Sequence, residues 1–198
     1  MSTFPKVVAP VAPSDVLVAP ASLDASAGRG AVDRAIHDGF LRPVDIGRAE
    51  VDPPVLLYVP FWRVDVSVDG FHLNLSLVTS GPRTIPVPTG GTRHKDAVVM
   101  ICARSTFPYE PKLPSIFGRL GGVPPLEIEK DELVGPAQAF EALRAGEVLD
   151  ADVRQADAER YASGLLLRAV DPRHALYAKY EPRVRSAVFC LVPVYYAR

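Results

Sequence analysis

The clearest alternation of hydrophobic and polar positions along the chain lies between residues 55 and 78. The alternation is strict on both sides of the pair Asp69-Gly70, and a period of two is typical of a strand with one buried face. Asp-Gly also suits the positive φ angles of a two-residue type I′ turn. The pattern therefore predicts a β-hairpin that turns at Asp69-Gly70. Its buried face would carry Val64, Val66, Val68, Phe71, Leu73, Leu75 and Leu77.

Shorter apolar segments predict further strands on both sides of this hairpin. Residues 84–88 contain Pro86 and Pro88, so they are expected to form at best an edge strand. The remaining predicted strands are 15–19, 97–103, 126–129, 174–180 and 184–197, with a break at Glu181-Pro182.

Apolar residues spaced three and four apart predict helices over residues 27–40 and 153–170. Pro136 suits the first position of another helix, over residues 136–145, which would end before Gly146. These elements favour an α+β fold. We expect a largely antiparallel sheet with about three helices packed mainly on one face.

The length of 198 residues suits a single domain, which we place at residues 15–198. Residues 1–14 are rich in proline and are predicted to form an extended arm in front of this domain. Prolines and glycines also crowd residues 106–125, where we predict a long irregular loop. Loops of this length inside a compact domain often serve a function.

With 22 basic and 23 acidic residues, the chain has a net charge of −1 and shows no charge excess for nucleic-acid binding. It has no signal-peptide pattern and no apolar stretch of membrane-spanning length, so a cytoplasmic location is expected. The two cysteines, Cys102 and Cys190, lie in apolar segments. This position favours two buried thiols over a metal site.

Sequence motifs for phosphate-binding loops, hydrolase nucleophile elbows and HExxH metal sites are absent. We therefore predict no catalytic residue, no metal and no cofactor. An enzyme remains an alternative, because a fold can assemble a site from residues far apart in the sequence. Such a site would combine His94 or His174 with Asp96, Glu110 or Glu181.

Residues 90–95 are predicted to form a flexible basic loop that begins with two glycines. Glycine lets backbone N–H groups approach an anionic ligand closely. The candidate ligand-binding residues are Arg93, His94, Lys95, Arg104 and Arg119. The alternative for this segment is an ordinary solvated loop.

Large aromatic residues are candidates for a contact with a partner. Phe61 stands next to Trp62 in the predicted hairpin, and Tyr195 and Tyr196 lie near the end of the chain. Aromatic residues dominate the packing of protein cores, so the first interpretation is that they are core residues. The alternative is an exposed apolar patch for another protein.

The order of several short motifs resembles a group of poorly characterised bacterial proteins. A Gly-Phe-Leu-x-Pro pattern at residues 39–43 precedes Pro60-Phe61-Trp62, and Val192-Pro193-Val194-Tyr195-Tyr196 follows much later. Proteins of this group carry a Pro-Phe-Trp strand and a late Leu-Pro-x-Trp/Tyr strand, often behind a zinc ribbon. This chain has no cysteine pairs and so no ribbon. The resemblance implies a non-enzymatic or accessory role and supplies no catalytic residues.

We therefore predict a non-catalytic interaction, scaffold or accessory protein of a bacterial-type intracellular complex, with a protein partner or self-association. The first alternative is a module that binds a small anion through residues 90–95. The second alternative is an enzyme whose site is assembled in space.

Overall fold

The computed structural model describes residues 15–21, 26–30, 34, 53–105, 128–171 and 175–196. Within these residues the chain combines a mixed sheet of five strands with helices, which confirms the predicted α+β fold. The predicted arm 1–14 and the predicted loop from residue 106 to 125 lie outside the described residues. Of the predicted helix 27–40, residues 27–30 and 34 are described, and they are helical.

The strands are β1 (Leu17–Val18), β2 (Val55–Ser80), β3 (Arg83–Cys102), β4 (Glu147–Val148) and β5 (Tyr177–Tyr196). The helical elements of the described residues include the 3₁₀ turn η3 (Lys130–Glu132), α3 (Phe140–Ala145) and α4 (Gln155–Val170). The strand order is β1-β5-β2-β3, and β4 also pairs with β2. Within the described ranges, no helix has both the length and the apolar character needed to cross a membrane.

Contacts within the chain divide it into two compact units. The first unit comprises Met1–Phe61, Cys102–Val153 and Val188–Arg198, and the second comprises Trp62–Ile101 and Arg154–Ala187. The prediction of a single domain over residues 15–198 stays a prediction.

The first unit is built around the beginning of β2 and the end of β5. β1 pairs with β5 in parallel, with Leu17 opposite Cys190, and β4 pairs with β2 in parallel, with Leu57 opposite Glu147. The largest fully buried side chains of this unit are Val18, Leu57, Tyr58, Val59, Pro60, Phe61, Phe189 and Leu191. The predicted strands 15–19 and 97–103 are confirmed in the form of β1 and the end of β3.

Two predictions in the first unit need correction. The predicted helix 136–145 begins only at Phe140, because residues 136–139 form a turn in which Gln138 N–H donates to the Gly135 carbonyl at 3.1 Å. The predicted strand 126–129 is wrong for its described part, since Ile128 and Glu129 are not in a strand and lead into η3.

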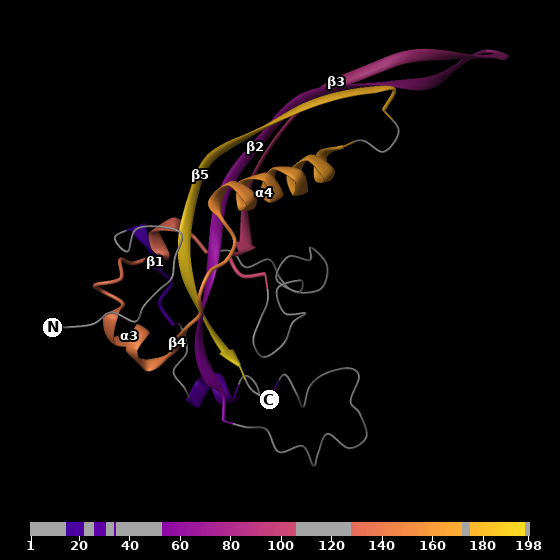
Figure 1. Cartoon of the computed structure of the whole chain (residues 1–198). Helices are drawn as coiled ribbons and strands as arrows, with labels where there is room; N and C mark the ends of the chain where they lie inside the picture. Colours follow the sequence, from indigo (N-terminus) through magenta and orange to yellow (C-terminus); the bar gives the residue numbers. More distant parts are fainter. Residues whose placement is uncertain are drawn as a thin grey trace. The chain divides into compact units, whose positions relative to one another are not determined.

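The second unit is a three-stranded sheet with one helix packed against it (Figure 1). α4 confirms the predicted helix 153–170, and its buried residues Ala158, Ala162, Leu166 and Val170 recur every four positions. The guanidinium of Arg93 in β3 donates to the carbonyl of Val170, the last residue of α4, at 3.1 Å. Alternation along the strands places Arg93 on the same face as the fully buried Val64, Val66 and Val68. α4 therefore covers this face.

The predicted turn at Asp69-Gly70 is wrong, because β2 runs through it without interruption. A Cβ atom built on Gly70 would lie 2.7 Å from Cα of Tyr180 and would also collide with the carbonyl oxygen of Lys179. Gly70 therefore serves a close approach of β5 and not a turn. The hairpin turns instead at Gly81-Pro82, where Gly81 has a φ of +62°. Glycine at this first central position suits a type II′ turn.

Two other predicted interruptions are also wrong. Residues 90–95 are part of β3 and not a loop, and β5 continues through Glu181-Pro182. Both segments stay extended because each of them pairs with an antiparallel neighbouring strand in the second unit. The predicted edge strand at residues 84–88 is confirmed, because β3 is the terminal strand in the sheet order.

Candidate functional site

The continuous β2 places the two halves of its apolar pattern on opposite faces of the sheet. Val64 and Val68 occupy even positions and are buried, whereas Phe71 and Leu77 occupy odd positions. Successive side chains of a strand point to opposite faces, so the odd positions face away from α4. The prediction that both halves share one buried face is therefore wrong.

The odd positions of β2 carry an exposed apolar row, which we call the leucine row. It consists of Phe71, Leu73, Leu75 and Leu77, whose exposed fractions are 40%, 42%, 51% and 73%. The Phe71 ring also contacts Tyr177 of β5, with ring centroids 5.5 Å apart. The row is thus continuous with an aromatic side chain of the neighbouring strand.

On the same face, beside the leucine row, β3 carries residues with a compact side chain or none. A Cβ built on Gly90 would lie 2.7 Å from Cδ2 of Leu73, so Gly90 shares the face of the row. Alternation adds Pro88 and Pro86 to that face. We call Pro86, Pro88 and Gly90 the proline–glycine lane.

Hydrogen bonding shows which edge of the hairpin is open. The Leu73 carbonyl accepts the N–H of Leu176 at 2.8 Å, so the backbone groups of Leu73 point toward β5. The backbone groups of Gly90, which faces Leu73, consequently point to the outer edge of β3. Pro86 and Pro88 have the same parity, and they remove two outward N–H groups from that edge.

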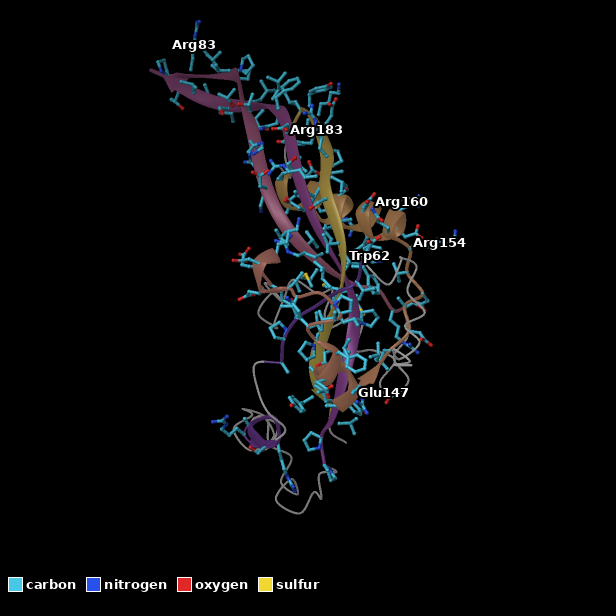
Figure 2. The ribbon with its side chains drawn as sticks, turned by 90° about the vertical axis from the view of Figure 1, so that its left-hand side faces the viewer. Trp62, Arg83, Glu147, Arg154, Arg160 and Arg183 are labelled. Carbon is cyan, nitrogen blue, oxygen red and sulfur yellow. The ribbon has the colours of Figure 1, made fainter. Side chains whose placement is uncertain are left out.

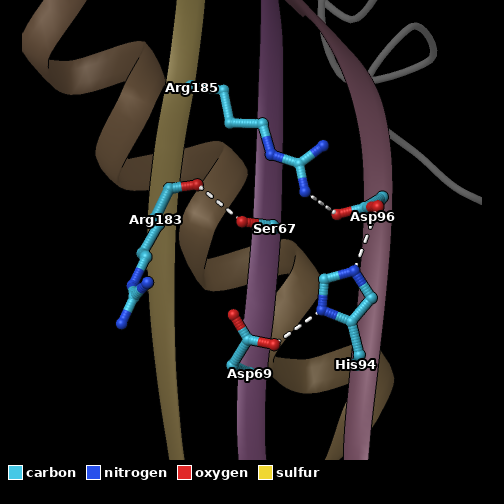
Figure 3. Close-up of polar contacts among 6 residues, drawn as sticks. All are labelled: Ser67, Asp69, His94, Asp96, Arg183 and Arg185. Atoms are coloured by element: carbon cyan, nitrogen blue, oxygen red, sulfur yellow. Dashed lines mark hydrogen bonds and ion pairs between the residues drawn. The ribbon is translucent and has the colours of Figure 1, made fainter.

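A polar network occupies the same face of the sheet, farther from the hairpin turn than the leucine row (Figure 3). His94 Nδ1 lies 2.6 Å from Asp69 Oδ1, and His94 Nε2 lies 3.1 Å from Asp96 Oδ2. The Arg185 guanidinium donates to Asp96 Oδ1 at 2.6 Å. The side chains come from β2, β3 and β5, so the network ties the three strands together at the base of the leucine row.

Charge coupling shifts two pKa values in this network. The hydrogen bond to Asp69, followed by the one to Asp96, raises the pKa of His94. The same hydrogen bond from His94 lowers the pKa of Asp69. The two carboxylates therefore stabilise the protonated form of the His94 ring.

One of the contacts that the enzyme alternative requires is present, because His94 and Asp96 are hydrogen-bonded. Both ring nitrogens of His94 face carboxylates, however, so neither is positioned to take a proton from a nucleophile. The side chain is also 55% exposed on an open sheet face. Glu181 pairs with Lys179 at 3.0 Å, while His174 and Glu110 lie outside the described residues. This arrangement can stabilise strands but lacks the geometry of a general base.

Within the second unit, the predicted anion-binding residues Arg93, His94 and Lys95 do not share one face of β3. His94 lies on the face opposite Arg93 and Lys95, because adjacent strand residues alternate. Arg93 donates to the end of α4. Arg104 belongs to the first unit and donates to the Asp150 carbonyl at 2.9 Å, and Arg119 lies outside the described residues. Anion binding stays a prediction.

A hollow of about 230 Å³ lies on the exposed side of α4 in the second unit. Asp157, Arg160, Tyr161 and Arg168 are among its lining residues, and Figure 2 shows Arg160 on this helix. Of the predicted anion-binding residues that the structure describes, none lines this hollow. In the described part of the chain, no group of three or more His, Cys, Asp or Glu residues could hold a metal ion.

The aromatic candidates belong to the first unit. Phe61 is 1% exposed and cannot serve as a partner contact, so it takes the core role. Tyr195 and Tyr196 are half-buried, and the Tyr195 ring lies 2.8 Å from a Cβ built on Gly28. Of the two thiols, Cys190 is buried, whereas Cys102 is half-buried and burial raises its pKa to about 11.

The leucine row is the feature that the sequence pattern alone places wrongly. The pattern predicts its residues in the core, because the change from even to odd apolar positions at Asp69-Gly70 is also typical of a turn. In a continuous strand the same change of parity moves the apolar residues to the other face. That change of parity is the signal that could have located the row.

Comparison with known proteins adds no further assignment. No protein-family model matches the chain, and neither a curated protein nor a solved structure shows significant similarity to it.

Proposed function

We propose that this chain is a non-catalytic interaction protein that binds another protein through the leucine row. The observation that carries the proposal is an apolar row on an open sheet face, with every second side chain 40–73% exposed. Contiguous exposed apolar patches on soluble proteins commonly mark interaction sites. A sheet with an apolar face normally buries that face against another layer.

The energetics support a contact of useful strength. Fully burying a leucine or phenylalanine side chain contributes about 1.5–3 kcal/mol, so covering the exposed halves of this row contributes on the order of 5 kcal/mol. The polar network at the base of the row fixes β2, β3 and β5 relative to one another within the unit. A rigid surface loses less conformational entropy on binding than a flexible one.

Photo-crosslinking in the native host tests this proposal. A benzoylphenylalanine in place of Leu75 stands in the row, and one in place of Glu181 stands on the neighbouring strand beside charged residues. We expect a crosslinked protein product from position 75 and little or none from position 181. Equal absence of product at both positions would overturn the proposed function.

A further inference from the structure

The hollow on α4 has walls that all belong to this one helix. Its lining residues are Asp157, Arg160, Tyr161, Gly164, Leu165 and Arg168. They lie on the side of α4 opposite the buried Ala158 and Ala162, so the hollow faces away from the sheet. A small ligand is normally held between several elements of a fold. An occupant of this hollow must instead bring an extended surface of its own.

Gly164 lines the hollow, and no contact among the described residues requires a glycine there. A Cβ atom built on Gly164 would meet no atom within 4 Å. Glycine in the interior of a helix is less stable than alanine, so the position stays open at a cost in stability. Glycine is the residue expected where another backbone approaches closely.

The spacing of the lining residues matches the holes into which a facing helix inserts its side chains. Such a hole is formed by four residues of one helix, at positions i, i+3, i+4 and i+7. The lining residues form two of these sets, one from Asp157 to Gly164 and the next from Tyr161 to Arg168. The two holes are one helical turn apart, so two side chains one turn apart on a second helix fill both.

The two ends of the hollow carry positive charge. Arg160 and Arg168 are eight positions apart, which is roughly 12 Å along the helix axis. Asp157 lies 3.7 Å from the Arg160 guanidinium, with both side chains exposed, and no described residue pairs with Arg168. The whole second unit contains 11 Lys and Arg residues against 7 Asp and Glu residues, a net charge of +4, in a chain whose net charge is −1. Carboxylates therefore suit both ends of the hollow.

We propose that the exposed side of α4 is a second docking site, whose occupant is an acidic amphipathic helix of another protein. Two apolar side chains of that helix fill the two holes beside Tyr161 and Leu165. Its carboxylates pair with Arg160 and Arg168. This site goes beyond the proposed function, because α4 covers the face of the sheet opposite the leucine row.

Fluorescence anisotropy with a defined probe tests the site on the full chain. The probe is a fluorescein-labelled helical peptide, held by a hydrocarbon staple, with two leucines one turn apart and glutamates on both sides of them. A second peptide carries lysine in place of each glutamate. We expect the chain to bind the glutamate peptide, and the lysine peptide at least roughly tenfold more weakly. Equal binding of the two peptides, or no binding of the glutamate peptide up to roughly 1 mM chain, would overturn the proposal.

Two matched pairs of substitutions distinguish the hollow from the rest of α4. Gly164→Leu fills the hollow, whereas Ala156→Leu adds the same side chain to an exposed position outside it. Arg168→Glu reverses a charge at one end of the hollow, and Arg154→Glu reverses one at the beginning of the helix. We expect the first variant of each pair to raise the Kd for the glutamate peptide roughly tenfold, and the second to change it less than about twofold. Equal effects within either pair would overturn the proposal.

A thermal melt separates lost binding from lost folding. Leucine favours a helix more than glycine does, and position 164 opens onto free space. Gly164→Leu should therefore unfold at the same temperature as the wild type or higher, so its weaker binding reports on the hollow.

An oligonucleotide identifies the class of partner. Arginine and exposed tyrosine side chains also suit single-stranded nucleic acid, so a labelled RNA oligonucleotide is titrated in the same way. RNA that binds more tightly than the glutamate peptide, and is lost in Arg168→Glu, would overturn the acidic helix as the occupant. Neither result bears on the leucine row, whose test is the crosslink from position 75 on the opposite face of the sheet.

Discussion

At the scale of single residues, Gly70 shows how a correct local rule leads to a wrong element. Asp-Gly is a strong turn signal, yet here the missing Cβ makes room for the backbone of β5 at Lys179 and Tyr180. The sequence shows only that position 70 is a glycine. A turn and the close approach of another strand both favour a glycine there, so the pair Asp-Gly does not distinguish them. The same applies to His94, whose contact with Asp69 spans 25 positions and depends on the strand pairing.

A substitution at Gly70 tests whether the glycine is needed for the close approach of β5. Gly70→Ala places a methyl group against backbone atoms that cannot rotate away, so we expect the free energy of unfolding to fall by about 1–3 kcal/mol. Gly164→Ala in α4 is the matched control, because nothing lies within 4 Å of its Cβ position, and it should raise stability by about 0.5–1 kcal/mol. Chemical denaturation measures both. Equal effects of the two substitutions would contradict the close approach at Gly70.

The His94 network predicts a pH dependence with a defined sign. The folded chain raises the pKa of His94 above its ordinary value of about 6.5, so the stabilising contribution of the protonated ring is complete below that value. It is lost as the pH rises through the raised pKa. Asp69 acts in the opposite direction, since its lowered pKa gives a contribution that is lost in acid.

An NMR titration of the His94 ring measures this coupling. We expect a midpoint above 6.5 in the wild type, and a larger decrease in Asp69→Asn than in Asp96→Asn, because Asp69 is the larger cause of the shift. A midpoint that is unchanged in both variants would show that the network does not form in solution.

At the scale of elements, the amphipathic helix and the short apolar strands were predictable, whereas the long strands were not. α4 was found from its spacing of apolar residues, and β1 and the end of β3 from short apolar segments. Glycine and proline at Gly90-Gly91 and Glu181-Pro182 predict the end of a strand. In the structure each segment stays extended because a neighbouring strand pairs with it. Strand length in this sheet is therefore a tertiary property, which a single sequence does not display.

The contact between β3 and α4 gives a prediction at this scale. The guanidinium of Arg93 satisfies a carbonyl at the C-terminal end of α4, where a positive charge is favourable. Arg93→Met should reduce the free energy of unfolding by about 1 kcal/mol. Lys95→Met removes a charge two positions along the same face of β3 and should change stability by less than about 0.5 kcal/mol. Denaturation midpoints of the two variants that coincide would argue against the cap.

The outer edge of β3, where Pro86 and Pro88 lie, gives another prediction at the scale of elements. Replacing both Pro86 and Pro88 by threonine restores two outward N–H groups on an exposed strand and so removes the protection of the edge. We expect the double variant to aggregate faster than the wild type on incubation, as measured by thioflavin fluorescence and turbidity. Replacing Thr84 and Thr92 by serine serves as the control, because it leaves the outward N–H groups unchanged. Equal aggregation of the two double variants would show that the prolines do not guard this edge.

At the scale of the whole molecule, we propose that a sheet face exposed in the isolated chain is covered when the protein functions. The second unit places an apolar row and a polar network on one face of its three strands and a helix on the other. The hydrophobic periodicity predicts the fold class, but the parity of β2 decides which apolar residues remain at the surface. The proposed interaction surface therefore follows from strand continuity and not from any motif.

Hydroxyl-radical footprinting in living cells of the native host, compared with dilute purified chain, tests this claim most directly. Leu75 and Val55 have nearly equal exposed fractions, 51% and 50%, and Val55 lies in the first unit, outside the row. We predict that oxidation of Leu75 relative to Val55 falls several-fold in the cell and returns on dilution. An equal ratio in the cell and in dilute solution would show that the leucine row stays bare, and would contradict the account.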